Sequence, residues 1–328
     1  MGQQIRFKTK IGQIPVIPGS QPLLDIPRQH DYESIFMRLS GVVSVTTAGG
    51  NVRNEAPCQL VPRVELTSEG RNTHFNAPFW RGSIGNYERP WGVINTLSTS
   101  EFLAPASAAV ASYPFKATAV IDLCNVDGVR PKDSNLRTLN MSLFQLRPTF
   151  GNPGDMFVGS TAVFVGIPLL EVFGITMYEV PGDNYSTPGV LKKTTYQEIA
   201  IPTSNTTQEI RLPAGNVLKS VVVRAEGAVT PGEPSSSIIN NMILQSAQDV
   251  RFNYTGNMVR SINQMDYGSL TPGYYVLDMT SQGRTQSNLT DGWNCQGQAE
   301  PKLILDVVGG ANVRVQVCTT EMIFATPI

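Results

Sequence analysis

The feature that most constrains this chain is a strand pattern that occurs twice. AVIDL, residues 119–123, returns in the second half of the sequence as YVLDM, residues 275–279. The flanking segments repeat in the same order, as two strands, a helix candidate, this strand, a long polar loop and two more strands. The matching pairs are RVELTS (63–68) with NMILQS (241–246), THFNAP (73–78) with VRFNYT (250–255), LNMSLFQL (139–146) with KLILDVV (302–308), and 161–173 with 312–324. The shared order predicts that one structural unit is present twice.

The repeated segments have the composition of strands. They are short runs rich in Val, Ile, Leu, Thr and Phe, separated by clusters of Gly, Pro, Asn and Asp. Helical periodicity is limited to residues 100–113 and 256–265, each directly before the strand described above. In the second of these, Met258, Ile262 and Met265 share one helical face. The sequence therefore predicts an all-β chain with one short helix in each half.

Each half has the size of a two-sheet jelly roll, a fold in which two packed sheets leave few exposed strand edges. The predicted fold is two tandem jelly-roll β-sandwiches, a double jelly roll; a single continuous barrel is the alternative. The Pro- and Gly-rich stretch 181–189 marks the joint. The predicted organisation is an extended N-terminal arm (1–31), a first jelly roll (32–180), a linker (181–194) and a second jelly roll (195–328).

The chain is poor in charged residues. Only 16% of the residues are Asp, Glu, Lys or Arg, against about 25% in ordinary soluble domains, and the net charge is −1. A large chain with so little charge is poorly suited to remain monomeric. A neutral surface rich in Ser, Thr and Asn is one interpretation. The interpretation that we favour is that much of the surface is buried against other subunits.

Nothing in the sequence predicts a membrane-spanning helix or a signal peptide. The most apolar stretch, 160–180, contains Pro168 and Glu171, and the N-terminus lacks an apolar core. The four cysteines have no CxxC spacing, so free, buried thiols in a reducing cytoplasm are expected, although the spacing leaves disulfides open. These cysteines are Cys58, Cys124, Cys295 and Cys318.

Four segments also carry a resemblance to a known family. They are DGVRPKDSNLRTLNMSLFQL (127–146), LPAGNVLKSVVVRAEG (212–227), NYTGNMVRSINQMDYG (253–268) and PGYYVLDM (272–279). In this order they resemble the double jelly-roll major capsid proteins of tailless, lipid-containing icosahedral bacteriophages, of the corticovirus, finnlakevirus and tectivirus type. The likeness depends on the order and duplication of the segments more than on any single motif.

The resemblance implies a structural function in a virion. Three copies of such a chain place six barrels around a threefold axis, and these pseudo-hexagonal trimers tile an icosahedral shell above an internal membrane. The implied partners are the chain itself as a homotrimer, neighbouring trimers, penton and minor capsid proteins, and lipid headgroups. No sequence-specific nucleic-acid binding is implied, and assembly is expected in the cytoplasm of a bacterial host.

Residues for catalysis are scarce. Two histidines, His30 and His74, leave little for acid–base or metal chemistry, and His74 is expected to be packed in a strand. The sequence has no nucleophile elbow, phosphate-binding loop or dinucleotide fingerprint. We therefore expect neither an enzyme nor a cofactor.

The best metal candidate is weak. Asp122, Asn125 and Asp127 could contribute oxygens to calcium, but Leu123 and Ser134 occupy positions where a calcium loop needs acidic residues. An Asp-Gly turn is the simpler interpretation, and a weak calcium ion between subunits remains open.

Aromatic residues and arginine are concentrated in residues 74–92. Such residues can stack on bases or sugars, but they also form the centres of interfaces. We favour packing between the rolls or between subunits; a receptor-binding spike or carbohydrate-binding module is the alternative function. The residues expected at these contacts are Phe79, Trp80, Tyr87 and Trp91, together with Arg130 and Lys132.

The predicted arm is basic. Arg6, Lys8 and Lys10 precede the first acidic residue, Asp25, and several prolines favour an extended backbone. A solubilising tail is one interpretation. The other is an inward-facing arm that contacts anionic lipid headgroups or a neighbouring subunit beneath the shell.

Overall fold

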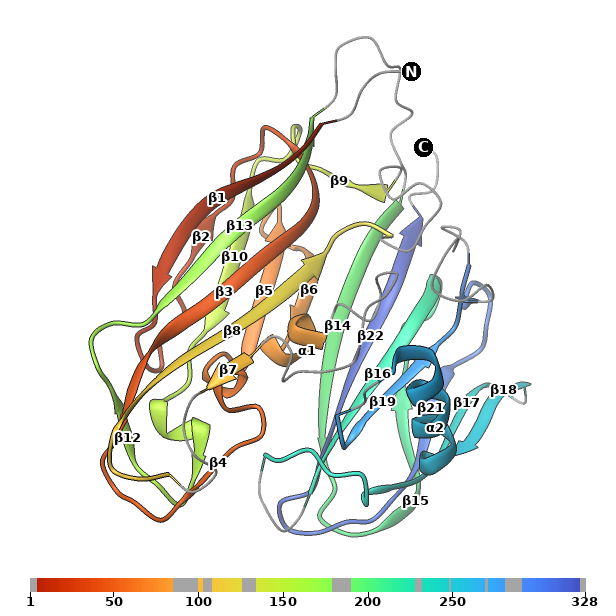
Figure 1. Cartoon of the computed structure of the whole chain (residues 1–328). Coiled ribbons are helices and arrows are strands. Elements are labelled where there is room, and N and C mark those ends of the chain that lie inside the picture. The colour runs from red at the N-terminus through yellow and green to blue at the C-terminus, as the bar shows by residue number, and fades with distance from the viewer. Residues whose placement is uncertain are drawn as a thin grey trace.

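The computed structural model describes residues 5–84, 100–102, 108–125, 134–178, 190–227, 232–247, 249–268, 271–280 and 291–324. Two β-sandwiches stand side by side, the first built from the N-terminal half of the chain and the second from the C-terminal half (Figure 1). The predicted double jelly roll is therefore confirmed.

The first roll packs two sheets against each other. One sheet has the order β1-β13-β3-β8-β7, that is Ile5–Pro15, Leu169–Tyr178, Asp31–Val45, Ser112–Asp122 and Ser100–Phe102, with β9 (Leu136–Arg137) and β12 (Ala162–Phe164) also paired with β3. The other has the order β6-β5-β10-β2, that is Asn72–Ala77, Arg63–Ser68, Phe144–Thr149 and Leu24–Asp25. A small pair, β4 (Asn51–Val52) and β11 (Phe157–Val158), and two 3₁₀ turns, Ala56–Leu60 and Pro153–Met156, complete it.

The second roll repeats this arrangement. One sheet has the order β19-β16-β22-β14, that is Tyr274–Asp278, Val217–Glu226, Arg314–Phe324 and Val190–Ala200, with β20 (Trp293–Asn294) paired to β16. The facing sheet has the order β15-β21-β17-β18, that is Asn205–Arg211, Pro301–Val307, Ile239–Ser246 and Asp249–Thr255.

The duplication extends to strand register. The repeated AVIDL and YVLDM segments lie at the ends of β8 and β19, where Asp122 is opposite Ser34 and Asp278 is opposite Ser220. The pairings of the other strands match in the same way. The corresponding elements are β1 with β14, β2 with β15, β3 with β16, β5 with β17, β6 with β18, β8 with β19, β9 with β20, β10 with β21, and β13 with β22.

The N-terminal arm requires a correction. Residues 5–15, which were expected in an arm outside the first roll, form β1 and pair antiparallel with β13, as β14 pairs with β22. The strand pattern is hidden in the sequence because β1 is an edge strand whose residues 6–10 are exposed, and edge strands commonly carry basic residues. Residues 190–194 of the predicted linker likewise belong to β14, while 181–189 lie outside the described residues.

One of the two helix predictions is correct. Helix α2, Gly256–Tyr267, begins where expected, because the Thr255 side chain accepts a hydrogen bond from the backbone N–H of Met258 at 3.2 Å. The helix predicted at 100–113 is wrong, since residues 100–102 form β7 and β8 begins at Ser112. Both ends of this segment pair in the sheet, while residues 103–107 lie outside the described residues. The counterpart of α2 is instead α1, Phe79–Ser83.

Hydrophobic side chains fill both sandwiches. In β3, Ile35, Met37 and Leu39 alternate into the first core, whereas β16 is buried along its whole length. One face of β16 belongs to the second core and the other packs against the first roll. No helix among the described residues is long and apolar enough to cross a membrane.

A shared sheet joins the two rolls. Strand β14 of the second roll runs parallel to β6 of the first, with Thr194 opposite Phe75. The pairing makes a single nine-stranded sheet that passes through both rolls. As a result, the outer face of the second-roll strands in this sheet packs against the first roll; these strands are β14, β22, β16 and β19.

Candidate functional site

The most elaborate polar contact among the described residues is the junction between the rolls. Helix α1 of the first roll lies on the outer face of the sheet that contains β22 and β16. The Trp80 Nε1–H donates to Gln316 Oε1 at 3.0 Å, and its ring meets the Tyr274 ring edge-to-face with centroids 5.3 Å apart. Arg81 Nη2 donates to Thr320 Oγ1 at 3.0 Å. The helix thus attaches the first roll to the second by direct side-chain contacts.

Arg224 of β16 is the centre of the junction. Its side chain is 1% exposed and donates to Glu55 Oε2 from Nε at 3.1 Å and from Nη2 at 2.9 Å. The same guanidinium also donates to Glu226, to Gln316 Oε1 at 3.1 Å and to the Gly232 carbonyl at 2.7 Å. Glu55 comes from the first roll, so the ion pair joins the two halves of the chain. All three nitrogens of the Arg224 guanidinium donate hydrogen bonds, and a buried charge is tolerated when it is paired and hydrogen-bonded in this way.

The pKa values in the junction follow from these contacts. Burial opposes the charge of Arg224, but the Coulombic attraction of Glu55 and Glu226 raises its pKa well above the usual value. Burial raises the pKa of Tyr274, and the negative charge of Glu55, to which its hydroxyl donates, raises it further. Arg224 therefore stays charged and Tyr274 neutral.

The aromatic residues of segment 74–92 that the structure describes are buried. Phe75, Phe79 and Trp80 are 4%, 0% and 4% exposed, so a ligand cannot stack on them in the folded chain. Tyr87, Trp91, Arg130 and Lys132 lie outside the described residues.

The calcium candidates are only partly described. Asp122 ends β8, and the buried Asn125 uses its backbone N–H to donate to Ser134 Oγ at 2.7 Å; Asp127 lies outside the described residues. In the described part of the chain no three His, Cys, Asp or Glu side chains are grouped so as to hold a metal ion. His74 is buried, with Nε2 2.7 Å from Ser68 Oγ, and burial lowers its pKa to about 4.

The basic residues of β1 are partly neutralised. Arg6 forms an ion pair with Glu33, and Lys10 Nζ lies 2.8 Å from Glu171 Oε1. Lys8 is exposed on the same strand. The positive charge available to a partner is therefore smaller than the sequence indicates.

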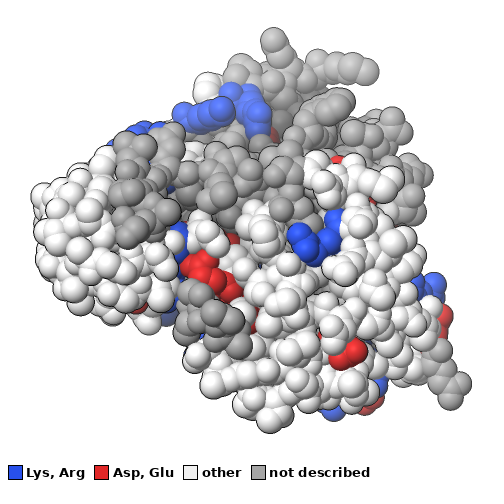
Figure 2. Space-filling view, turned by 60° about the horizontal axis from the view of Figure 1, so that its bottom comes forward, with Lys and Arg blue, Asp and Glu red and all other residues white. Residues whose placement is uncertain are grey.

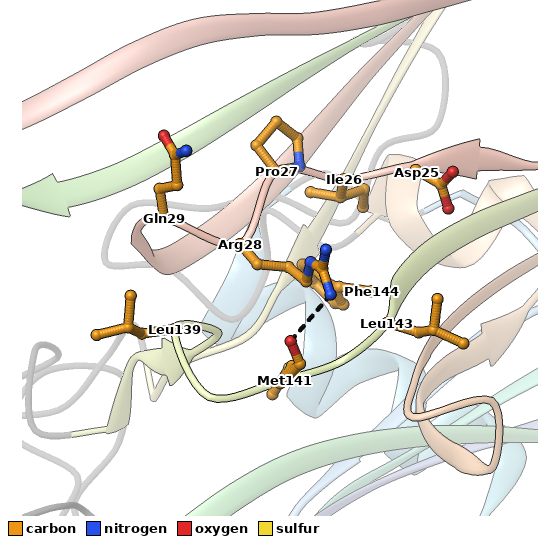
Figure 3. Close-up of a pocket in the computed structure, with 9 residues that line it drawn as sticks. All are labelled: Asp25, Ile26, Pro27, Arg28, Gln29, Leu139, Met141, Leu143 and Phe144. Carbon is orange, nitrogen blue, oxygen red and sulfur yellow. Dashed lines mark hydrogen bonds between the residues drawn. The ribbon is translucent and has the colours of Figure 1, made fainter.

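A surface groove of about 900 Å³ lies beside β2 and β10 (Figure 3). Its two ionisable side chains already have partners, since Arg28 Nη1 donates to the Met141 carbonyl at 3.1 Å and Asp25 accepts from Gln145 at 2.7 Å. The groove therefore has a mixed polar and apolar lining. It is lined by Asp25, Ile26, Pro27, Arg28, Gln29, Leu139, Met141, Leu143 and Phe144.

Much of the described surface carries no charge. Figure 2 shows one face on which uncharged residues cover most of both rolls, and the first roll at its left is almost free of charged side chains. Large apolar side chains are exposed as well, among them Met265 at 85% and Ile167 at 69%. Such a surface agrees with extensive contact to other proteins.

Sequence reasoning missed Glu55, Arg224, Tyr274 and Gln316. A signal was present, because VLKSVVVRAE (217–226) lacks the polar alternation of a strand with one solvated face. An Arg and a Glu within such a strand indicate buried charges that need partners.

The folded chain has the architecture of viral double jelly-roll capsid proteins, as the resemblance predicted. No protein-family model and no curated sequence matches it. Solved structures do match over nearly the whole chain. A chain of Sulfolobus turreted icosahedral virus has a TM-score of 0.74 at 14% identity, covering 98% of this chain and 91% of that one. The crystal structure of the major capsid protein of the same virus gives 0.72 at 15%, covering 98% and 97%.

A bacteriophage protein has the same fold. The major capsid protein of bacteriophage PM2 matches with a TM-score of 0.58 at 10% identity, covering 98% of each chain. At identities of 10–15%, the likeness to these solved structures establishes the fold alone.

Proposed function

We propose that this chain is the major capsid protein of an icosahedral virus and that its activity is self-assembly. The observation that carries the proposal is the duplication of the strand arrangement of the roll, combined with a fold shared over 98% of the chain with solved major capsid proteins. Two similar rolls in one polypeptide are suited to a homotrimer of six rolls. Its nearly hexagonal outline can tile a flat face of a shell.

The composition supports the same function. A tile buries its side walls against its neighbours, and a chain with 16% charged residues and a net charge of −1 loses little hydration when it does so. The junction at Arg224 holds the two rolls in one fixed orientation, which a tile requires. In this proposal the partners are other copies of the chain, with penton and minor capsid proteins at the vertices.

A membrane beneath the shell and assembly in a bacterial cytoplasm complete the proposal. We assign contacts with anionic headgroups to Arg6, Lys8 and Lys10 of β1; for Arg6 and Lys10 the headgroup competes with the ion pairs to Glu33 and Glu171. All four cysteines are buried thiols, in agreement with folding in a reducing compartment.

The alternative, a receptor-binding spike or carbohydrate-binding module, is less well supported. It needs accessible aromatic rings in segment 74–92, and Phe75, Phe79 and Trp80 are buried in the fold.

The test is the assembly state of the purified protein. Multi-angle light scattering should give the mass of three chains, and negative-stain images should show particles with six lobes. A monodisperse monomer at high concentration would refute the proposal. Abundance in the virion separates a shell protein, present in hundreds of copies, from a spike present only at the vertices.

A further inference from the structure

Two short segments meet across the junction, at the end of the molecule opposite the one where β1 begins and β22 finishes. Turn 53–55 of the first roll follows β4, and segment 232–234 of the second roll lies between β16 and β17 (Figure 1). The Glu233 carboxylate accepts from the backbone N–H of Asn54, at 3.2 Å to each of its oxygens. The two rolls therefore touch here in addition to the sheet that they share.

Carboxylates are concentrated at this contact. Glu55 and Glu226 share the buried guanidinium of Arg224, which donates to both. Glu233 places a third carboxyl group beside them, and Figure 2 shows acidic side chains at the boundary between the two rolls. A buried guanidinium carries one positive charge, so the ionised form of Glu233 adds a negative charge that Arg224 does not balance.

The charged and titratable groups around Glu233 come from both rolls. Arg53 of the first roll lies against segment 232–234, because a Cβ added at Gly232 would be 2.7 Å from its Nη1. The surrounding groups are Arg53 and Glu55 in turn 53–55, Arg224 and Glu226 on β16, Tyr274 on β19 and, along an adjoining cleft of about 470 Å³, Asp155 and Arg314. With Glu233 ionised, the carboxylates in this group outnumber the arginines.

Burial raises the pKa of the Glu233 carboxyl above its ordinary value of 4.5, and the charge of Glu55 raises it as well, against the opposing effects of the Asn54 N–H, Arg53 and Arg224. A raised pKa means that the folded chain holds this proton more tightly than the unfolded chain does. The stability that depends on the neutral carboxyl is therefore present below pH 4.5 and is lost as the pH rises through the folded-state pKa.

We propose that Glu233 is a proton-controlled latch between the two rolls, closed when its carboxyl is neutral and loosened when it is ionised. The neutral form still accepts a hydrogen bond from Asn54 and is not repelled by Glu55. The ion pair of Arg224 with Glu55 and the pairing of β6 with β14 persist in both states, so only the contact of turn 53–55 with segment 232–234 opens. The latch lies within one chain and does not depend on the proposed capsid function.

Hydrogen exchange at the Asn54 amide reports on the latch directly, because this N–H is the donor to Glu233. Exchange is followed by mass spectrometry on the full-length chain and divided into the intrinsic rate at the same pH, which removes the pH dependence of the exchange chemistry itself. Between about pH 5 and about pH 8, the resulting protection should fall at least about fivefold in the wild type. Glu233→Gln, which is neutral at every pH, should keep the Asn54 amide protected across the same range.

Ser142 supplies a control of opposite sign in the same samples. Its hydroxyl and its backbone N–H both donate to Glu69, and these hydrogen bonds lower the pKa of that carboxyl. The contribution of ionised Glu69 is present above pH 4.5 and is lost only as the pH falls, so protection of the Ser142 amide should not decrease toward about pH 8. Glu69→Gln lies outside the junction and should leave the exchange of Asn54 as it is in the wild type.

Urea unfolding gives an independent readout. At about pH 8, Glu233→Gln should unfold at a higher urea concentration than the wild type, and the difference should close as the pH falls. Wild-type protection of Asn54 that stays constant with pH, or that falls equally in Glu233→Gln, would overturn the latch. So would a Glu233→Gln chain that unfolds more easily than the wild type at about pH 8, because the ionised carboxylate would then stabilise the contact.

Discussion

The variant Arg224→Met should destabilise the folded chain by about 3–5 kcal/mol, the usual cost of removing one partner from a buried ion pair. Arg224 is 1% exposed and donates to Glu55, Glu226, Gln316 and the Gly232 carbonyl. Methionine fills a similar volume but donates nothing, so two carboxylates remain buried without their cation. The loss corresponds to a factor of about 150 to 4,000 in the ratio of folded to unfolded protein, at about 1.4 kcal/mol for each tenfold change.

Urea unfolding followed by tryptophan fluorescence measures this loss, because Trp80 lies beside Arg224, with the guanidinium carbon 5.9 Å from the ring centroid. The control is Arg63→Met, which breaks the 2.6 Å ion pair with Glu65 at a side chain that is 51% exposed. That pair should contribute at most about 1 kcal/mol. All variants are compared at one low protein concentration, so that assembly does not contribute.

A triple variant separates the orphaned charges from lost packing. Adding Glu55→Gln and Glu226→Gln to Arg224→Met removes the unpaired carboxylates and should recover more than about 1 kcal/mol. The reasoning is refuted if Arg224→Met lies within about 1 kcal/mol of the wild type, or if the triple variant is no more stable than the single one.

Three further predictions concern single residues. Burial lowers the pKa of His74 from 6.5 to about 4, so the stability that depends on a neutral imidazole is present above pH 6.5 and is lost as the pH falls toward 4. The wild type should therefore lose roughly 3 kcal/mol of unfolding free energy between pH 6.5 and pH 4, whereas His74→Gln should not show this loss. Urea unfolding at both pH values measures the difference. Burial raises the pKa of the Cys318 thiol to about 12, and all four cysteines are buried, so a thiol reagent should label the native chain slowly and label four sites after unfolding. At Gly41 an added Cβ would lie 2.5 Å from Pro168 Cβ and 2.9 Å from Phe115 Cζ, so Gly41→Ala should cost about 1–3 kcal/mol by thermal or urea unfolding.

The sequence was sufficient for the architecture because strand patterns and their order are local properties. The order of RVELTS, THFNAP and AVIDL, repeated in the second half, predicted that one unit is present twice, and the strand pairings of the two rolls match. The helix at Gly256–Tyr267 was predictable for the same reason, since its N-cap and periodicity are both local.

The elements that failed are those whose structure depends on distant partners. Strand β1 takes its place from β13, at the far end of the first roll in sequence, where Ile14 pairs with Leu170, and its charged, exposed residues resemble a tail. The contact of Arg224 with Glu55 joins residues 169 positions apart in different rolls. Neither partner can be identified from its own neighbourhood in the sequence.

The strand pairing of β6 with β14 has a consequence for dilution. Because both strands belong to one polypeptide, their association has an effective concentration that is fixed by the tether and does not change when the protein is diluted. Contacts between separate molecules lose occupancy on dilution, whereas this one does not. Disassembly of any larger particle therefore stops at the pair of rolls, and a single roll is never released.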